Sequence, residues 1–250
     1  MTRTVLITGG GTGIGRATAL HFAERGDTVF ATGRRRAPLD RLAEETGVRG
    51  LVCDHTQPEA LTALLAGLPE QIDVLVNNAG GNTDFDGDPG PDLALGGEAD
   101  LAAYAQAFRA NLDANLVSAA LTTRALDGRL AAGGAVVHIG SIAASRGSGP
   151  YGAYGASKAG LSTWNLDLAQ TLGPRGITAN VVAPGYIADT EFFRDRLQED
   201  RREQLVAATS TGRAGTPADI AETIAFLASP GARHITGQVL HVNGGAYMTH

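Results

Sequence analysis

Residues 4–15 read TVLITGGGTGIG, a short apolar run rich in β-branched residues that leads directly into a glycine-rich turn. The turn opens the helical pattern of residues 13–25, so it lies between an expected strand and an expected helix. Backbone N–H groups of such a turn can approach an anion closely, and the dipole of the helix adds to the attraction. This position favours a dinucleotide-binding turn; the alternative is a tight turn without a ligand.

The alternation of apolar runs and helical patterns continues along the chain. We expect strands at residues 4–8, 28–32, 51–54, 74–77, 135–141, 177–183 and 239–242. We expect helices at residues 13–25, 39–46, 59–68, about 102–130, 154–172 and 217–228, with Thr216 as N-cap of the last and Pro217 in its first turn. Continuous apolar strands are typical of a sheet covered on both faces. The sequence therefore predicts a single α/β domain over residues 1–250, a three-layer doubly wound parallel sheet of about seven strands.

Composition excludes several classes of protein. The chain has 250 residues, a net charge of −6 and 43% hydrophobic residues. The acidic balance argues against a nucleic acid or an anionic membrane as partner, and no apolar run has the roughly 20 residues that span a bilayer. One cysteine excludes an internal disulfide and a cysteine-cluster zinc site, and the six histidines show no metal-binding spacing. We expect a soluble, cytoplasmic protein without a metal.

Two segments break the regular alternation. Residues 81–97 are rich in Gly, Pro and Asp and are expected to form an irregular loop. Residues 186–213, which we call the flap segment, follow a Pro-Gly pair and combine Phe192 and Phe193 with many charges. Long irregular segments in a compact domain are often binding loops, although the two phenylalanines could equally pack within the segment or against a subunit.

Arginines follow the second expected strand, where a dinucleotide-binding fold chooses its cofactor. A carboxylate at this place would accept hydrogen bonds from the ribose hydroxyls of NAD. The chain has Arg34 and Arg35 instead, and guanidinium groups attract a 2′-phosphate. The sequence favours NADP(H); the alternative is a solvated basic turn.

The only lysine of the chain lies four residues after a tyrosine. Tyr154 and Lys158 at i and i+4 share one face of the expected helix. A nearby cation favours the phenolate, so Tyr154 could exchange a proton with a substrate oxygen near neutral pH. Ser141 ends the fifth expected strand, at the sheet edge where such folds bind ligands. An isolated Tyr-x-x-x-Lys pair is usually just a pair on a helix face.

Together these features resemble a classical short-chain dehydrogenase/reductase, and the resemblance covers essentially all 250 residues. The matching pieces are Thr8-Gly9-x-x-x-Gly13-Ile14-Gly15, Asp54, Asn77-Asn78-Ala79-Gly80, Ser141, Tyr154-x-x-x-Lys158 and Pro184-Gly185. Within the family the chain is most similar to the β-ketoacyl carrier-protein reductases and polyketide ketoreductases. The resemblance implies a Rossmann fold and a homotetramer, or at least a homo-oligomer, and the arginines after the second strand favour NADP(H) as the cofactor.

The family also implies roles for individual residues. Tyr154 would be the general acid, Ser141 would polarise the carbonyl, and Lys158 would hold the nicotinamide ribose and lower the pKa of the tyrosine. The relay asparagine of the family is Asn115 or Asn111, of which Asn115 fits the family spacing better. The other expected cofactor contacts are Gly9, Gly11, Thr12, Gly13, Ile14, Gly15, Arg34, Arg35, Asp54, His55, Asn78, Ala79, Gly80, Pro184, Gly185, Ile187 and Thr190. Expected substrate contacts are Ser141, Tyr154, Tyr186, Phe192 and Phe193.

The chain differs in sequence from the carrier-protein reductases, and these differences bear on which substrate we expect. The loop at residues 81–97 is longer than in that branch and carries four aspartates: Asp84, Asp86, Asp88 and Asp92. Of two basic residues that dock the carrier protein in that branch, one aligns with Arg175 and the other falls on Ala132. We therefore expect an NADPH-dependent ketoreductase acting on a bulky, aromatic or polyketide-derived ketone, in polyketide or antibiotic biosynthesis. The alternatives are a 3-oxoacyl-[acyl-carrier-protein] reductase and a non-catalytic NADP-binding sensor.

Overall fold

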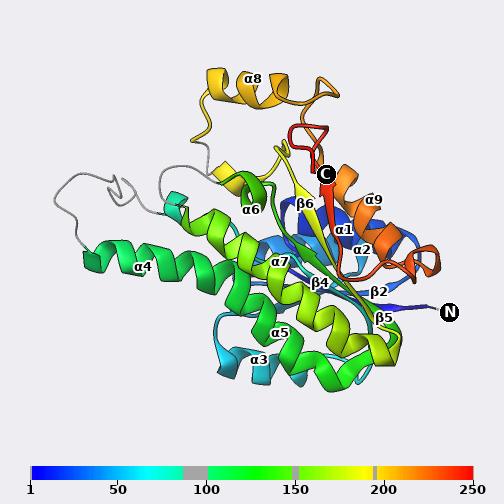
Figure 1. The fold of residues 1–250 in the computed structure, drawn as a ribbon. Coiled ribbons are helices and arrows are strands. Elements are labelled where there is room, and N and C mark those ends of the chain that lie inside the picture. Colours follow the sequence, from blue (N-terminus) through cyan, green and yellow to red (C-terminus); the bar gives the residue numbers. More distant parts are fainter. Residues whose placement is uncertain (1, 87–100, 148–151, 194–195, 250) are drawn as a thin grey trace.

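The computed structural model describes residues 2–86, 101–147, 152–193 and 196–249. These parts of the chain contain one sheet of parallel strands in the order β3-β2-β1-β4-β5-β6-β7 (Figure 1). The strands are β1 (Thr4–Thr8), β2 (Thr28–Gly33), β3 (Arg49–Val52), β4 (Ile72–Asn77), β5 (Leu130–Ile139), β6 (Thr178–Pro184) and β7 (Val239–Val242). The strand order reverses between β1 and β4, and sheets of this kind bind ligands at that point, beyond the carboxyl ends of the strands.

Helices cover both faces of the sheet, which confirms the predicted three-layer α/β architecture (Figure 1). One face carries α1 (Gly13–Glu24), α2 (Arg36–Thr46) and α9 (Pro217–Leu227). The other carries α3 (Pro58–Leu65), α4 (Leu101–Leu112), α5 (Ser118–Leu126) and α7 (Ala153–Leu172). The shorter helices α6 (Ala143–Arg146) and α8 (Glu199–Ala207) lie beyond the sheet.

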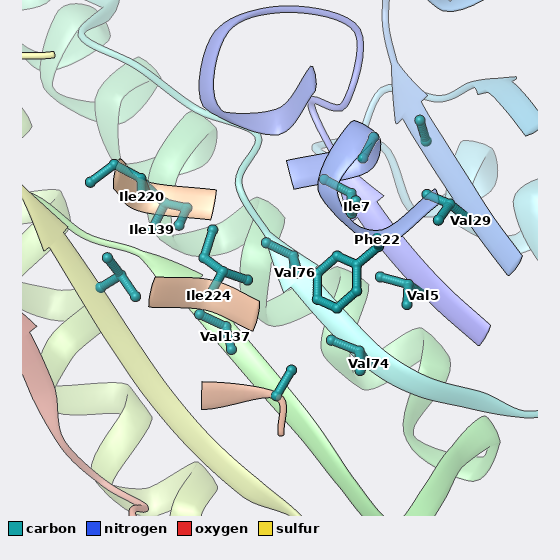
Figure 2. Close-up of a cluster of buried hydrophobic side chains, with 14 of the residues drawn as sticks. Val5, Ile7, Phe22, Val29, Val74, Val76, Val137, Ile139, Ile220 and Ile224 are labelled. Atoms are coloured by element: carbon teal, nitrogen blue, oxygen red, sulfur yellow. The ribbon is translucent and has the colours of Figure 1, made fainter. Parts of the chain in front are cut away.

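The alternation of side chains along each strand divides the core into two halves. Val5 and Ile7 point toward α1 and α9, where they pack with Phe22 and Ile224 (Figure 2). Leu6, between them in the sequence, points to the opposite face and belongs to the second cluster. Both faces of the sheet are therefore buried, which is why its strands read as continuous apolar runs.

Several predicted boundaries are accurate and others are wrong. The predicted strands 4–8 and 239–242 match β1 and β7, and Thr216 forms a capping box with Asp219 at the start of α9. The long helix expected at about 102–130 is interrupted by a π-helical turn, η2 (Asp113–Val117), and ends in a 3₁₀ turn. No helix in the described ranges is both long and apolar enough to cross a bilayer.

Candidate active site

The glycine-rich turn connects β1 to α1 as predicted, and its geometry requires glycine. Gly9 and Gly13 have φ angles of +64° and +52°, a region that side chains disfavour. A Cβ atom at Gly15 would lie 2.2 Å from the Gly9 carbonyl oxygen. Thr12 is the N-cap residue of α1, and no side chain caps this helix. The first N–H groups of α1 are therefore available to an anion.

The loop after β4 is fixed against the glycine-rich turn. Asn78 donates from Nδ2 to the Thr8 carbonyl at 2.9 Å and to the Gly9 carbonyl at 3.0 Å. In return, Thr8 Oγ1 accepts hydrogen bonds from the backbone N–H groups of Asn78 and Ala79. The ends of β1 and β4 are thereby tied together at the reversal of strand order.

Tyr154 and Lys158 lie one turn apart at the start of α7 and are both buried. Lys158 Nζ is 5.9 Å from the centre of the Tyr154 ring and donates to the Ile139 carbonyl oxygen at 2.7 Å. This bond ties the ammonium group to the end of β5. The predicted pairing on one helix face is therefore present, with the lysine held by the sheet.

The pKa shifts of this pair differ from the sequence-based expectation. Burial raises the pKa of Tyr154 to about 12, against an opposing effect of its hydrogen bond with Ser141. Burial also lowers the pKa of Lys158 to about 7. The sequence predicted a net lowering of the tyrosine pKa, whereas desolvation of the buried phenolate is the largest cause of its shift and raises it. At neutral pH Tyr154 therefore holds its proton.

Ser141 lies beyond the end of β5 rather than within it. The strand ends at Ile139, whereas the sequence predicted an end at residue 141. Gly140 still donates to the Val182 carbonyl at 2.7 Å, but the chain then turns, and Ser141 Oγ accepts a hydrogen bond from the N–H of Ala143 at 3.1 Å. This turn places Ser141 beside Tyr154, with which its side chain is hydrogen-bonded.

Asn115 lies in the π-helical turn η2 and is fully buried. Its side chain accepts from the Gly81 N–H and donates to the Gly81 carbonyl, both at 2.9 Å, and donates to the Asn111 carbonyl. The side chain therefore does not line the cavity; it fixes the loop after β4. Asn111, the other candidate, donates to Asp84 and accepts from the Thr83 N–H in the same loop.

The expected adenosine end of the site contains Arg34, Arg35, Asp54 and His55. Burial raises the pKa of Asp54, but hydrogen bonds from Thr56 and the charge of Arg34 outweigh this effect and leave it below its usual value. Burial lowers the pKa of His55 to about 4. Its ring lies 2.7 Å from both Thr32 and Thr122, so it joins β2 to α5 as a neutral side chain.

Aromatic side chains form a cluster in the site. The Phe192 ring centre lies 5.6 Å from that of Tyr154 and 4.9 Å from that of Phe193. Phe85, from the loop after β4, lies 6.0 Å from Phe192, and Tyr186 lies 6.1 Å from Phe193. The three predicted aromatic contacts therefore form one cluster with Phe85, and Phe192 joins this cluster to Tyr154. The expectations for Asp88 and Asp92 lie outside the described residues.

One cavity of about 1110 Å³ connects these groups. Its wall includes Gly9, Arg34, Lys158, Tyr154 and Phe192. The predicted residues on its wall are Gly9, Thr12, Gly13, Ile14, Arg34, Arg35, Asp54, His55, Asn78, Ala79, Gly80, Ser141, Tyr154, Lys158, Pro184, Gly185, Tyr186, Ile187, Thr190, Phe192 and Phe193. Gly11 lines a neighbouring pocket, Gly15 packs on Gly9, and Asn115 lies behind the wall. In the described part of the chain no group of three His, Cys, Asp or Glu side chains could hold a metal.

Two residues on the wall of the cavity and one buried histidine on β5 could not be found by sequence reasoning. Arg146 and Arg201 line the cavity, yet single exposed arginines carry no pattern in a sequence. His138 is fully buried on β5, where Asn77 donates to its Nδ1 at 3.1 Å. Burial and the charge of Lys158 lower the pKa of His138 to about 3. The only sequence signal for it was a polar residue within an apolar strand.

Comparison with known proteins agrees with this arrangement. A family model described as enoyl-(acyl carrier protein) reductase matches residues 9–247. The 3-oxoacyl-[acyl-carrier-protein] reductase FabG of Vibrio cholerae serotype O1 is 33% identical over 253 residues, and FabG of Escherichia coli K12 is 34% identical over 251 residues. Each alignment covers 98% of both chains. The crystal structure of BdcA in complex with NADPH is similar at a TM-score of 0.81 and 30% identity, covering 97% of this chain and 93% of that one.

Proposed function

Because the chain belongs to the short-chain dehydrogenase/reductase family, close to its 3-oxoacyl-[acyl-carrier-protein] reductase branch, we propose that it is an NADPH-dependent ketoreductase. Members of this group are oxidoreductases that act on a CH–OH or C=O group. The observation that carries the proposal is the meeting of Tyr154, Ser141 and Lys158 in the cavity that begins at the glycine-rich turn.

The residues along the cavity fit NADPH. The glycines of the turn, which have no side chains, leave its backbone uncovered for the pyrophosphate at the uncapped start of α1. Arg34 and Arg35 supply positive charge for the 2′-phosphate, and Asp54 is an ionised acceptor for the adenine amino group. Lys158 lies deeper, where it can hold the hydroxyls of the nicotinamide ribose. BdcA, of similar fold, binds NADPH.

We assign the proton chemistry to three side chains. Bound NADPH supplies a hydride to the carbonyl carbon of the substrate. Ser141 donates a hydrogen bond to the carbonyl oxygen and polarises it. Tyr154, kept protonated by its raised pKa, gives its proton to the same oxygen as charge develops on it. Lys158 stabilises the resulting phenolate, and its own pKa near 7 allows it to pass on a proton in turn.

We propose a bulky or aromatic ketone, such as a polyketide-derived one, as the substrate. Phe85, Phe192, Phe193 and Tyr186 surround the approach to Tyr154 and favour a flat apolar molecule. Arg175, which aligns with a carrier-docking residue of FabG-like enzymes, is engaged within the chain: it donates to the Asp127 carboxylate at 2.7 Å and to two backbone carbonyls. The relatives named FabG favour the alternative, a 3-oxoacyl thioester as substrate.

A panel of substrates separates these candidates. We expect NADPH oxidation with bicyclic aromatic ketones at a kcat/KM at least about tenfold above that with a β-ketoacyl thioester. In the variant Phe192→Ala, the KM for the aromatic ketone should rise about three- to tenfold. The reason is that the ketone loses a contact with the Phe192 ring that is worth roughly 0.5–1.5 kcal/mol. Faster turnover of the thioester would support the fatty-acid reductase, and NADPH binding without any turnover would support the sensor.

We also propose that the protein is a homotetramer. Val117 and Leu166 are exposed by 36% and 48% on the helical layer, and Val239 and Leu240 by 37% and 40% on the edge strand β7. Apolar side chains exposed on two separate surfaces are suited to two subunit contacts. Light scattering should then give four times the chain mass of 25.7 kDa; the mass of one chain would contradict the proposal.

A further inference from the structure

An ion pair joins the expected phosphate-binding loop to the flap segment. Arg35 Nη2 lies 2.5 Å from Glu191 Oε2, and both side chains remain more than half exposed at the mouth of the cavity. Arg35 follows β2, whereas Glu191 begins the 3₁₀ turn η5 (Glu191–Phe193). The carboxylate therefore occupies a guanidinium that we assign to the 2′-phosphate of the cofactor.

The same short turn carries the aromatic contact to the catalytic tyrosine. Phe192 directly follows Glu191, and its ring lies edge-on to Tyr154 at 5.6 Å. Because the two residues are adjacent in one 3₁₀ turn, a shift of the backbone of η5 would displace both side chains. The ion pair with Arg35 and the contact of Phe192 with Tyr154 thus share one short backbone segment.

The start of the flap segment is held by backbone hydrogen bonds, so any change in the position of η5 begins beyond these bonds. Gly215 donates to the Tyr186 carbonyl at 3.0 Å and accepts from the Ala188 N–H at 2.9 Å. Asp189 follows with a φ of +57°, and within the described ranges it is the one residue other than glycine in this left-handed region. The chain therefore leaves its anchor through a strained residue that lies two positions before the start of η5.

We propose that Glu191 competes with the 2′-phosphate of NADPH for Arg35 and that this exchange releases Phe192 from Tyr154. The proposal rests on the proposed function, since it requires the cofactor at this site. A guanidinium that binds two anions binds each of them less strongly than it would bind one alone. Binding of the phosphate to Arg35 therefore weakens its ion pair with Glu191. A cofactor without that phosphate leaves the pair intact. The 2′-phosphate thereby governs access of the ketone to Tyr154 as well as affinity for the cofactor.

Two measurements on Glu191→Gln test the competition and the coupling. By titration of protein fluorescence, the variant should bind NADPH about two- to fivefold more tightly than wild type, the range expected for loss of an exposed ion pair. Its affinity for NADH should not change. In steady-state kinetics with NADH, the KM for the ketone should fall by a similar factor, toward the value that wild type shows with NADPH.

Glu203→Gln provides the matched control, because it removes the same charge from an exposed position on α8. In an Arg35→Ala background, Glu191→Gln should have no further effect on NADPH binding. An unchanged affinity of Glu191→Gln for NADPH, or an equal gain in Glu203→Gln, would overturn the proposal. If wild type bound NADPH no more tightly than NADH, the assignment of the cofactor itself would be wrong. If wild type preferred NADPH and Glu191→Gln left that preference unchanged, only the proposed competition would be wrong.

Discussion

Tyr154→Phe is expected to reduce the kcat of NADPH-dependent ketone reduction by about 10²- to 10⁴-fold, the usual contribution of a positioned general acid. The variant keeps the ring that packs against Phe192 and loses only the proton donor. Burial of Tyr154 in the cavity, with a pKa raised to about 12, means that its hydroxyl is protonated throughout the neutral range. Removal of this hydroxyl therefore removes the proton donor of the reaction.

The dissociation constant for NADPH should meanwhile rise by no more than about tenfold, because one hydrogen bond without a charge contributes about 0.5–1.5 kcal/mol. Tyr104→Phe is the matched control, since Tyr104 lies on α4, packs on Phe108 and does not line the cavity. Stopped-flow measurement of the first turnover isolates the chemical step from product release. A wild-type rate in Tyr154→Phe would refute the assigned acid.

The fold could be predicted because its determinants are local and repeated. Continuous apolar strands, a glycine-rich turn after the first of them, and a capping box at Thr216 each indicate their structure within a few residues. Strand and helix ends were less accurate. Apart from His138, residues 135–141 are apolar or small, so the sequence predicts a strand that reaches Ser141. The strand ends at Ile139, whose carbonyl accepts a hydrogen bond from Lys158.

The electrostatics of the site could not be predicted, because they depend on burial in three dimensions. A tyrosine and a lysine at i and i+4 on an exposed helix would favour the phenolate. In the structure both groups are taken out of water, so both charged forms are disfavoured. Similarly, Asn115 was assigned from its spacing, whereas only the structure reveals that its side chain is fully used by Gly81 and Asn111.

The three arginines after β2 differ in what they contact, and this difference was invisible in the sequence. Arg36 lies in the first turn of α2 within 3.9 Å of Asp40, and Arg35 is paired with Glu191. Arg34 lines the cavity beside Asp54, and among the described residues no carboxylate lies within ion-pair distance of it. Arg34 is therefore the guanidinium most available to a phosphate.

Arg34→Ala should accordingly raise the dissociation constant for NADPH about ten- to hundredfold, since hydrogen bonds to a charged partner contribute roughly 1.5–3 kcal/mol. The dissociation constant for NADH should rise by less than about twofold, because that cofactor brings no 2′-phosphate. Arg36→Ala removes an equal charge two residues away and should weaken NADPH by no more than about twofold. Titration at two salt concentrations strengthens the comparison: the effect of Arg34→Ala should shrink as salt screens the phosphate. Equal losses for NADPH and NADH would show that Arg34 holds the loop rather than the phosphate.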